Sequence, residues 1–209
     1  MKDAKISATL DLDRVAVMGQ SAGNHVVGQG LTDGCSLAKA QILIDPVDGF
    51  DPFGFVHSED LITPGKKLKY SIPSLLLDNE LDPRKKNFLF PACALAKPGA
   101  PRWFNAVAGP AFNVNASRYG HIDCLDDIYI AAGNLLCPTN KTTNKDAYRS
   151  YLATTIDMFL DGLFQGHPDN LKKLEDASTF GIDVTVRQDL KGVSLGDIKP
   201  GCTQEVIVV

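Results

Sequence analysis

V-A-V-M-G-Q-S-A-G, at residues 15–23, is the most informative segment of this chain because it joins an apolar run to a helix-like run through a sharp turn. We expect the strand to span residues 14–18 and the helix to span residues 22–31. A strand, a G-x-S-x-G turn and a helix in this order present the serine hydroxyl at the tip of an elbow. Glycines fit two positions either side of the serine because larger side chains there would collide with the strand and the helix. The pattern therefore predicts that Ser21 is a nucleophile.

Further short runs along the chain are apolar at nearly every position. They predict strands at residues 40–44, 74–77 and 111–115, a long helix within residues 147–164, and an edge strand at residues 206–209. Apolar strands of this kind are typical of parallel sheets, which are buried on both faces. Strands that alternate with helices and long crossovers predict a single α/β domain with a mostly parallel sheet and flanking helices. The tail, residues 166–209, is mixed in pattern.

The composition of the chain limits its class. Its 209 residues, of which 44% are hydrophobic, are enough for one domain with a buried core. A net charge of −4 without a basic cluster argues against nucleic-acid binding. The sequence has no continuous apolar run of about 18 residues, which is the length that a membrane-spanning helix needs. The five cysteines form no C-x-x-C pair, so we expect no zinc site and leave their pairing open.

A serine hydroxyl needs a positioned base to become nucleophilic, and the chain offers four histidines. His121 lies in Y-G-H-I-D, residues 119–123, just after the last predicted internal strand. His25 lies on the helix after the elbow and points along it, while His57 lies in a long loop and His167 at the end of the long helix. In α/β-hydrolases the chain order is serine, acid, histidine, and the histidine follows the last strand. We therefore expect His121 to be the general base.

An acid must hold the imidazole by its second nitrogen and stabilise the imidazolium. Asp45 stands at the end of the second predicted strand, where the ligand sites of α/β sheets gather. Asp82 follows the third strand, a common position for the acid in this fold, and Asp48 is a third candidate. Spacing does not separate these aspartates, and an Asp before Pro is also an ordinary turn residue.

Three further segments stand out: I-D-P-V-D-G at residues 44–49, F-P-A-C-A at residues 90–94 and Y-G-H-I-D-C-L-D-D at residues 119–127. Together they resemble chlorophyllases, α/β-hydrolases that cleave the phytyl ester of chlorophyll to chlorophyllide and phytol. The resemblance extends from the first strand to the long helix. It implies a serine carboxylic-ester hydrolase without a metal or other cofactor, with Ser21 as nucleophile, Asp45 as acid and His121 as base. Chlorophyllases usually have glycine where Asp82 stands, which favours Asp45.

The elbow departs from the chlorophyllase pattern, which usually reads G-H-S-R-G-G. Gln20, Ala22 and Asn24 replace its histidine, its arginine and its last glycine. None of the three is the nucleophile, and the backbone N–H of Ala22 can still donate to an oxyanion. The changes leave two alternatives: a carboxylesterase or lipase-like hydrolase of other lipophilic esters, or a non-catalytic protein that binds pigment or lipid.

A long loop at residues 47–69, rich in glycine, proline and phenylalanine, separates the second and third predicted strands. Loops of this length in a compact domain often cover a site. We expect Phe50, Phe53 and Phe55 to form an apolar wall for the phytyl chain or the macrocycle, and the alternative is a cluster that only packs the loop. The resemblance also implies contact with a membrane surface and a plastid location.

Residues 1–13 are all that precede the first predicted strand, whereas four strands precede the elbow in α/β-hydrolases. We therefore expect the chain to hold the C-terminal part of an α/β-hydrolase fold, without the N-terminal strands and the second oxyanion donor. The elbow strand would then lie at an apolar, unpaired sheet edge, which favours aggregation. This interpretation predicts low stability and little activity.

Overall fold

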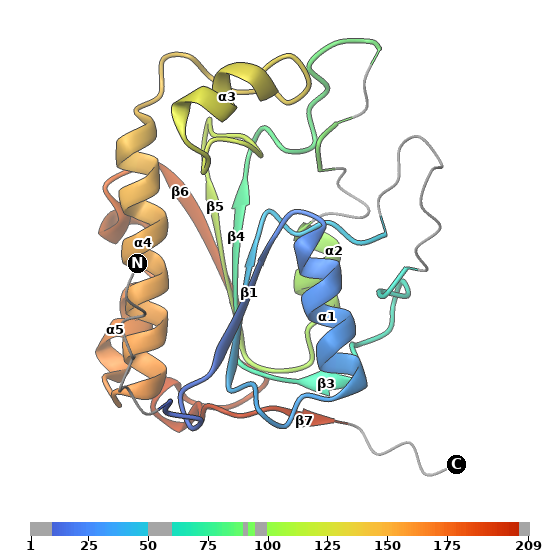
Figure 1. Cartoon of the computed structure of the whole chain (residues 1–209). Helices are drawn as coiled ribbons and strands as arrows, with labels where there is room; N and C mark the ends of the chain where they lie inside the picture. The colour runs from blue at the N-terminus through green and yellow to red at the C-terminus, as the bar shows by residue number, and fades with distance from the viewer. Residues whose placement is uncertain (1–9, 50–59, 90–91, 95–99, 205–209) are drawn as a thin grey trace, which may run out of the picture.

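The computed structural model describes residues 10–49, 60–89, 92–94 and 100–204, and its centre is a five-stranded sheet (Figure 1). The strands lie in the order β1-β2-β4-β5-β6. Their bounds are β1 Ala16–Gln20, β2 Ala40–Ile44, β4 Ser74–Asn79, β5 Ala111–Ala116 and β6 Val184–Asp189. The first four run parallel, and β6 pairs antiparallel to β5. The prediction of an α/β fold with a mostly parallel sheet is confirmed.

Helices cover both faces of this sheet (Figure 1). One face carries α1 (Gly23–Asp33) and α2 (Ala100–Ala106), and the other carries α4 (Lys145–Phe164) and α5 (Pro168–Lys173). The short α3 (Asp127–Gly133) lies beyond the carboxyl ends of the strands. At the amino ends, β3 (Tyr70–Ser71) pairs antiparallel with β7 (Thr203–Gln204). Two 3-10 helices, Ala177–Phe180 and Leu195–Asp197, flank β6 in the sequence.

Two hydrophobic cores, one on each face, hold the helices to the sheet. Phe159 of α4 lies in one core with Leu75 and Leu77. Trp103 of α2 lies in the other core with Leu76. Successive residues of β4 thus point to opposite faces, and every residue of β4 is buried. Burial on both faces explains the uninterrupted apolar run that predicted this strand.

Several predicted elements are recovered with small shifts. β1 begins and ends two residues later than predicted, so Gly19 and Gln20 belong to the strand rather than to the turn. α4 begins at Lys145, where the Asn144 side chain accepts hydrogen bonds from two N–H groups of the first turn. The sequence did not predict α2, α3, α5 or β6. The predicted strand at residues 206–209 lies outside the described residues.

β1 forms one edge of the sheet within the described part of the chain, as predicted. Its residues are only partly buried, and the Met18 side chain is 57% exposed. The serine that follows β1 therefore sits at the border of the sheet. None of the helices that the structure describes is long and apolar enough to cross a bilayer.

Two disulfides close the fold at opposite ends of the strands. Cys35, after α1, pairs with Cys202, directly before β7, near the amino ends. Cys93 pairs with Cys137, which follows α3 on the carboxyl side. Cys124 keeps a free thiol. The pairing that the sequence left open therefore joins four of the five cysteines.

Candidate active site

Ser21 lies on a sharp turn between β1 and α1, as predicted. Its φ is +54°, in the left-handed region that residues other than glycine seldom adopt. Its N–H donates to the Ile44 carbonyl (3.0 Å), the next carbonyl along the edge of β2. Its own carbonyl accepts hydrogen bonds from the Val47 N–H (3.3 Å) and from Asn24 Nδ2 (3.0 Å). These contacts hold the serine backbone in a strained conformation that exposes the hydroxyl side of the turn.

The two glycines of the elbow differ in what they do. A Cβ at Gly19 would lie 2.8 Å from the backbone nitrogen of Asn24, so no side chain fits there. A Cβ at Gly23 would meet no atom within 4 Å. The predicted collision is therefore confirmed at Gly19 and wrong at Gly23, because α1 leaves the turn with Gly23 on its exposed side.

His121 follows β5 and reaches the serine from across the sheet. Its Nε2 lies 2.7 Å from Ser21 Oγ, although the two residues are 100 positions apart in sequence. Gln20 Nε2 donates to the His121 carbonyl (3.3 Å) and so links the end of β1 to the histidine loop. The structure thus brings together the nucleophile and the base that the sequence predicted.

The histidine loop is fixed by its own neighbours. The Gly120 N–H donates to the Asp123 carboxylate (2.9 Å), which also forms an ion pair with Lys145 of α4 (2.8 Å). A Cβ at Gly120 would collide with the Pro138 carbonyl, so this position also requires glycine. These contacts, none of which involves the imidazole, set the direction of the His121 side chain.

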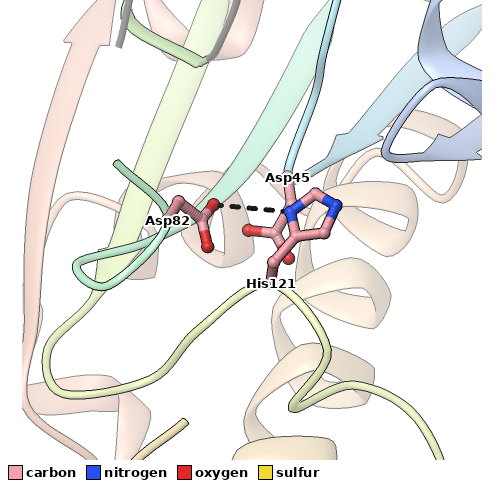
Figure 2. A group of neighbouring side chains, drawn as sticks. All are labelled: Asp45, Asp82 and His121. Atoms are coloured by element: carbon pink, nitrogen blue, oxygen red, sulfur yellow. Dashed lines mark ion pairs between the residues drawn. The ribbon is translucent and has the colours of Figure 1, made fainter. Parts of the chain in front are cut away.

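Figure 2 shows two carboxylates, those of Asp45 and Asp82, beside the His121 imidazole. Asp82 Oδ2 lies 4.0 Å from His121 Nδ1. Asp45 is fully buried, and both of its oxygens accept from Asn79 Nδ2 (2.8 and 2.9 Å). One polar atom from each of Asp45, Asp82 and His121 lies within 4.8 Å of the other two. Both leading candidates for the acid therefore lie near the His121 imidazole.

Burial changes the protonation of this region. The pKa of Asp45 is raised well above its ordinary value, first by complete burial and next by the negative charge of Asp82. Burial also raises the pKa of Asp78, in β4, to about 7, and that of the Cys124 thiol to about 11. Burial thus shifts Asp45 toward its protonated form, and Cys124 remains a thiol near neutral pH.

Asp48, the third candidate for the acid, belongs to a different group of contacts. Its carboxylate lies 2.8 Å from His25 Nδ1 and accepts hydrogen bonds from the N–H groups of Leu61 (3.0 Å) and Ile62 (2.8 Å). Arg102 lies 3.8 Å from its second oxygen. Asp48 therefore anchors the far end of the long loop to α1 and α2, and it makes no contact with His121 among those described.

Ala22 stands where a backbone donor for an oxyanion would be needed. It is the N-cap of α1, it is exposed, and no described residue accepts a hydrogen bond from its N–H. A free N–H at a helix start is suited to a developing negative charge. Phe50, Phe53 and Phe55 lie outside the described residues, as does His57.

The spacing of Asp45, Asp82 and His121 does not match a common metal site. Asp82 Oδ2 and His121 Nδ1 lie 4.0 Å apart, whereas ligands about 2.0–2.2 Å from a tetrahedral zinc lie roughly 3.3–3.6 Å from one another. Calcium takes about 6–8 oxygen ligands, more than these side chains supply. We therefore interpret the group in terms of proton chemistry.

The sequence did not reveal the amides that support the candidate site. Asn79, the last residue of β4, holds Asp45 and also lies 2.8 Å from the Tyr148 hydroxyl. Asn24 Nδ2 donates to the carbonyls of Ser21 and Ile44, which ties the elbow to β2. The usable signal was a polar residue directly after a buried apolar run, as in L-L-L-D-N at residues 75–79.

Comparison with known proteins gives a consistent result. The family model described as Chlorophyllase matches residues 4–187. Chlorophyllase-2 of Arabidopsis thaliana is 26% identical over 155 residues, which cover 69% of this chain and 46% of that protein. The chain thus spans about half the length of the curated relative it matches.

Proposed function

Because the chain belongs to the chlorophyllase family, we propose that it is a serine carboxylic-ester hydrolase that uses Ser21, His121 and Asp45. The main support is the 2.7 Å contact between His121 Nε2 and Ser21 Oγ, which joins a strained elbow to a loop 100 residues away. A serine hydroxyl that gives its proton to a buried imidazole is the arrangement that covalent ester hydrolysis requires.

The reaction follows from these positions. Ser21 Oγ attacks the ester carbonyl while His121 Nε2 takes its proton, and an acid on the Nδ1 side stabilises the imidazolium. The oxyanion accepts a hydrogen bond from the Ala22 N–H; one such donor contributes about 2.7–4 kcal/mol to the transition state. His121 then protonates the leaving alkoxide, and water repeats the cycle on the acyl-enzyme.

The substrate we propose is the phytyl ester of chlorophyll, cleaved to chlorophyllide and phytol. Family membership supports a lipophilic ester. The wall of Phe50, Phe53 and Phe55, contact with a membrane surface and a plastid location remain predictions that go with this substrate. Hydrolysis of other lipophilic esters is the second candidate, favoured by the changed elbow residues Gln20 and Ala22.

The test is release of chlorophyllide from chlorophyll a, measured by chromatography, alongside hydrolysis of p-nitrophenyl butyrate. We expect the parent chain to release both products, though slowly because the sequence predicts little activity, and Ser21→Ala to release neither. Ser36→Ala, which changes an exposed serine outside the site, is the matched control and should behave as the parent.

The outcomes separate the candidates. Butyrate hydrolysis without chlorophyllide would favour the second candidate. Chlorophyll binding without reaction with a fluorophosphonate probe would favour a non-catalytic binding protein and contradict the proposed hydrolase.

A further inference from the structure

We propose that Asp45 and Asp82 act as a pair that shares one proton behind His121, so that either carboxylate can orient the imidazole. The inference rests on the proposed hydrolase function and adds Asp82 as a second positioning residue. A single acid is the usual arrangement in serine hydrolases.

The fold brings the two carboxylates to one place. Asp45 directly follows β2, and Asp82 lies three residues after β4. β2 and β4 are neighbouring parallel strands, with Ile44 opposite Leu77. Their carboxyl ends therefore meet at the same edge, and Figure 2 shows both side chains directed toward His121.

The polar atoms between these side chains lack partners. His121 Nδ1 and Asp82 Oδ1 are buried and have no hydrogen bond within the described part of the chain. Because Nε2 accepts the Ser21 proton during attack, Nδ1 must carry a hydrogen, which needs an acceptor. Asp82 Oδ2, at 4.0 Å, faces it, and such contacts often tighten when substrate binds.

One proton must lie on the pair. Two buried carboxylates with an oxygen of each within 4.8 Å of the other resist ionising together, because each charge opposes the other. Asp45 is 0% exposed and Asp82 is 6% exposed, so burial favours the proton on Asp45. The raised pKa of Asp45 has the same direction and the same causes.

The other titratable groups near the pair do not supply its charge below neutral pH. Those that face Asp45 are Asp78 of β4, Cys124 of the histidine loop, and Tyr148 and Tyr151 of α4. Burial raises the pKa of all four, and that of Asp78 to about 7. Below about pH 7 all four therefore favour their neutral forms, and above it Asp78 ionises.

A shared proton predicts that the two single variants differ in pH dependence. In Asp82→Asn, Asp45 no longer faces a second carboxylate, so it can ionise and orient the imidazole in place of Asp82. Its burial still keeps its pKa high. The acid limb of the pH profile, where kcat/KM falls as the pH is lowered, should therefore move to higher pH. In Asp45→Asn, the less buried Asp82 is the carboxylate that remains, and the limb should not move to higher pH. Each single variant should keep activity within about tenfold of the parent at pH 8, whereas the double variant should lose about 10⁴-fold.

The experiment measures kcat/KM for p-nitrophenyl butyrate from pH 5 to 9 in the parent, both single variants and the double variant. Asp78→Asn is the matched control, because it neutralises a neighbouring buried carboxyl that does not face His121. The pKa of the His121 imidazole is followed in the same proteins by ¹H–¹⁵N NMR. It should fall by more than about one unit only in the double variant.

A single variant that loses as much kcat/KM as the double variant would show that one acid works alone. A fully active double variant would show that neither carboxylate acts on the imidazole. Either result would overturn the pair. If the double variant does not fold, the two single variants decide. A shift of the acid limb to higher pH in Asp82→Asn but not in Asp45→Asn would support the pair. An inactive parent would count against the proposed hydrolase. The pKa of the His121 imidazole, compared across the parent and the variants, would still test whether the two carboxylates act as a pair.

Discussion

The amino and carboxyl ends of the central sheet differ in how they treat buried polar groups. At the amino ends, Gln41 Nε2 donates to Ser74 Oγ (2.8 Å), and the Tyr70 hydroxyl donates to Gln41 Oε1 (3.3 Å). Ser74 Oγ in turn donates to the Ile72 carbonyl (2.8 Å). These side chains thus form one connected and satisfied network.

At the carboxyl ends, two residues of the candidate site have a strained backbone, and several buried polar atoms lack a hydrogen-bond partner within the described residues. Ser21 and Asp45 both have positive φ, +54° and +43°. Buried atoms without a hydrogen bond within the described residues include Asn24 Oδ1, Asn79 Oδ1, Asp82 Oδ1 and His121 Nδ1. Native proteins satisfy most buried polar groups and keep strain for functional sites. The difference teaches that one end holds a satisfied hydrogen-bond network, while the other carries the strain and unpaired polar atoms that are typical of functional sites.

The largest effect should come from removing the strained nucleophile. We expect Ser21→Gly to lower kcat/KM for p-nitrophenyl butyrate by at least about 10⁴-fold, because no other group can attack the ester. The same change should raise the free energy of unfolding by about 1 kcal/mol, since glycine adopts this conformation without strain. Ester kinetics and urea unfolding of one preparation measure both.

The control for this prediction is Ser21→Ala, which removes the hydroxyl but keeps the strain. It should lose the activity without the gain in stability. A glycine variant less stable than the alanine variant would contradict the assignment of strain to this residue.

The next effect concerns the disulfides at the two ends. The Cys35–Cys202 bridge spans 167 residues, so we expect its removal by double serine substitution to lower the free energy of unfolding by about 4–5 kcal/mol. The Cys93–Cys137 bridge, on the carboxyl side, spans 44 residues and should contribute about 1 kcal/mol less. Urea unfolding of both double variants without reductant compares them. A larger loss on the carboxyl side would reverse the proposed division between the ends.

Asp78 should make stability depend on pH. Because its pKa is raised to about 7, the folded protein holds a proton between about pH 4 and 7 that the unfolded chain releases. The free energy of unfolding should therefore fall as pH rises through this range, by up to about 4 kcal/mol at about 1.4 kcal/mol per pKa unit.

Asp78→Asn should remove this part of the pH dependence, since the amide oxygen can still accept from Asn113 Nδ2, now 2.7 Å from the carboxylate. Urea unfolding at pH 4 and pH 8 measures the change. An unchanged pH dependence in the variant would mean that Asp78 titrates normally in the folded protein.

The smallest effect concerns the hydrogen-bond network at the amino ends of the strands. Ser74→Ala should lower the free energy of unfolding by about 1–3 kcal/mol, because Gln41 Nε2 loses its acceptor. Ester hydrolysis should stay within about twofold of the parent. A loss of activity without a loss of stability would show that the amino-end network also serves the site.

The sequence predicted the interior of the sheet better than its border. β2 and β4 carry continuous apolar runs because both faces are buried, and that run is visible without a structure. β6, with V-T-V-R-Q-D at residues 184–189, pairs on one side only and is half exposed, so its pattern is weak. α3 has no buried residue, so it offers no periodic apolar face.

At the site, the sequence predicted the groups that chemistry requires and missed those that hold them. Ser21 and His121 are confirmed as neighbours. The choice between Asp45 and Asp82 was open because each follows one of two adjacent parallel strands, and both strands end at the same edge. Asn79 was missed because its role depends on contacts between segments distant in sequence.

The site takes one residue from the end of each of four consecutive strands: Ser21 after β1, Asp45 after β2, Asp82 after β4 and His121 after β5. A slip of one residue between any two of these strands would turn a whole set of side chains to the other face. The proposed ester hydrolysis would therefore report on the registration of every parallel pair at once. A colony screen for activity would select, among random variants of this chain, those in which the sheet has assembled correctly.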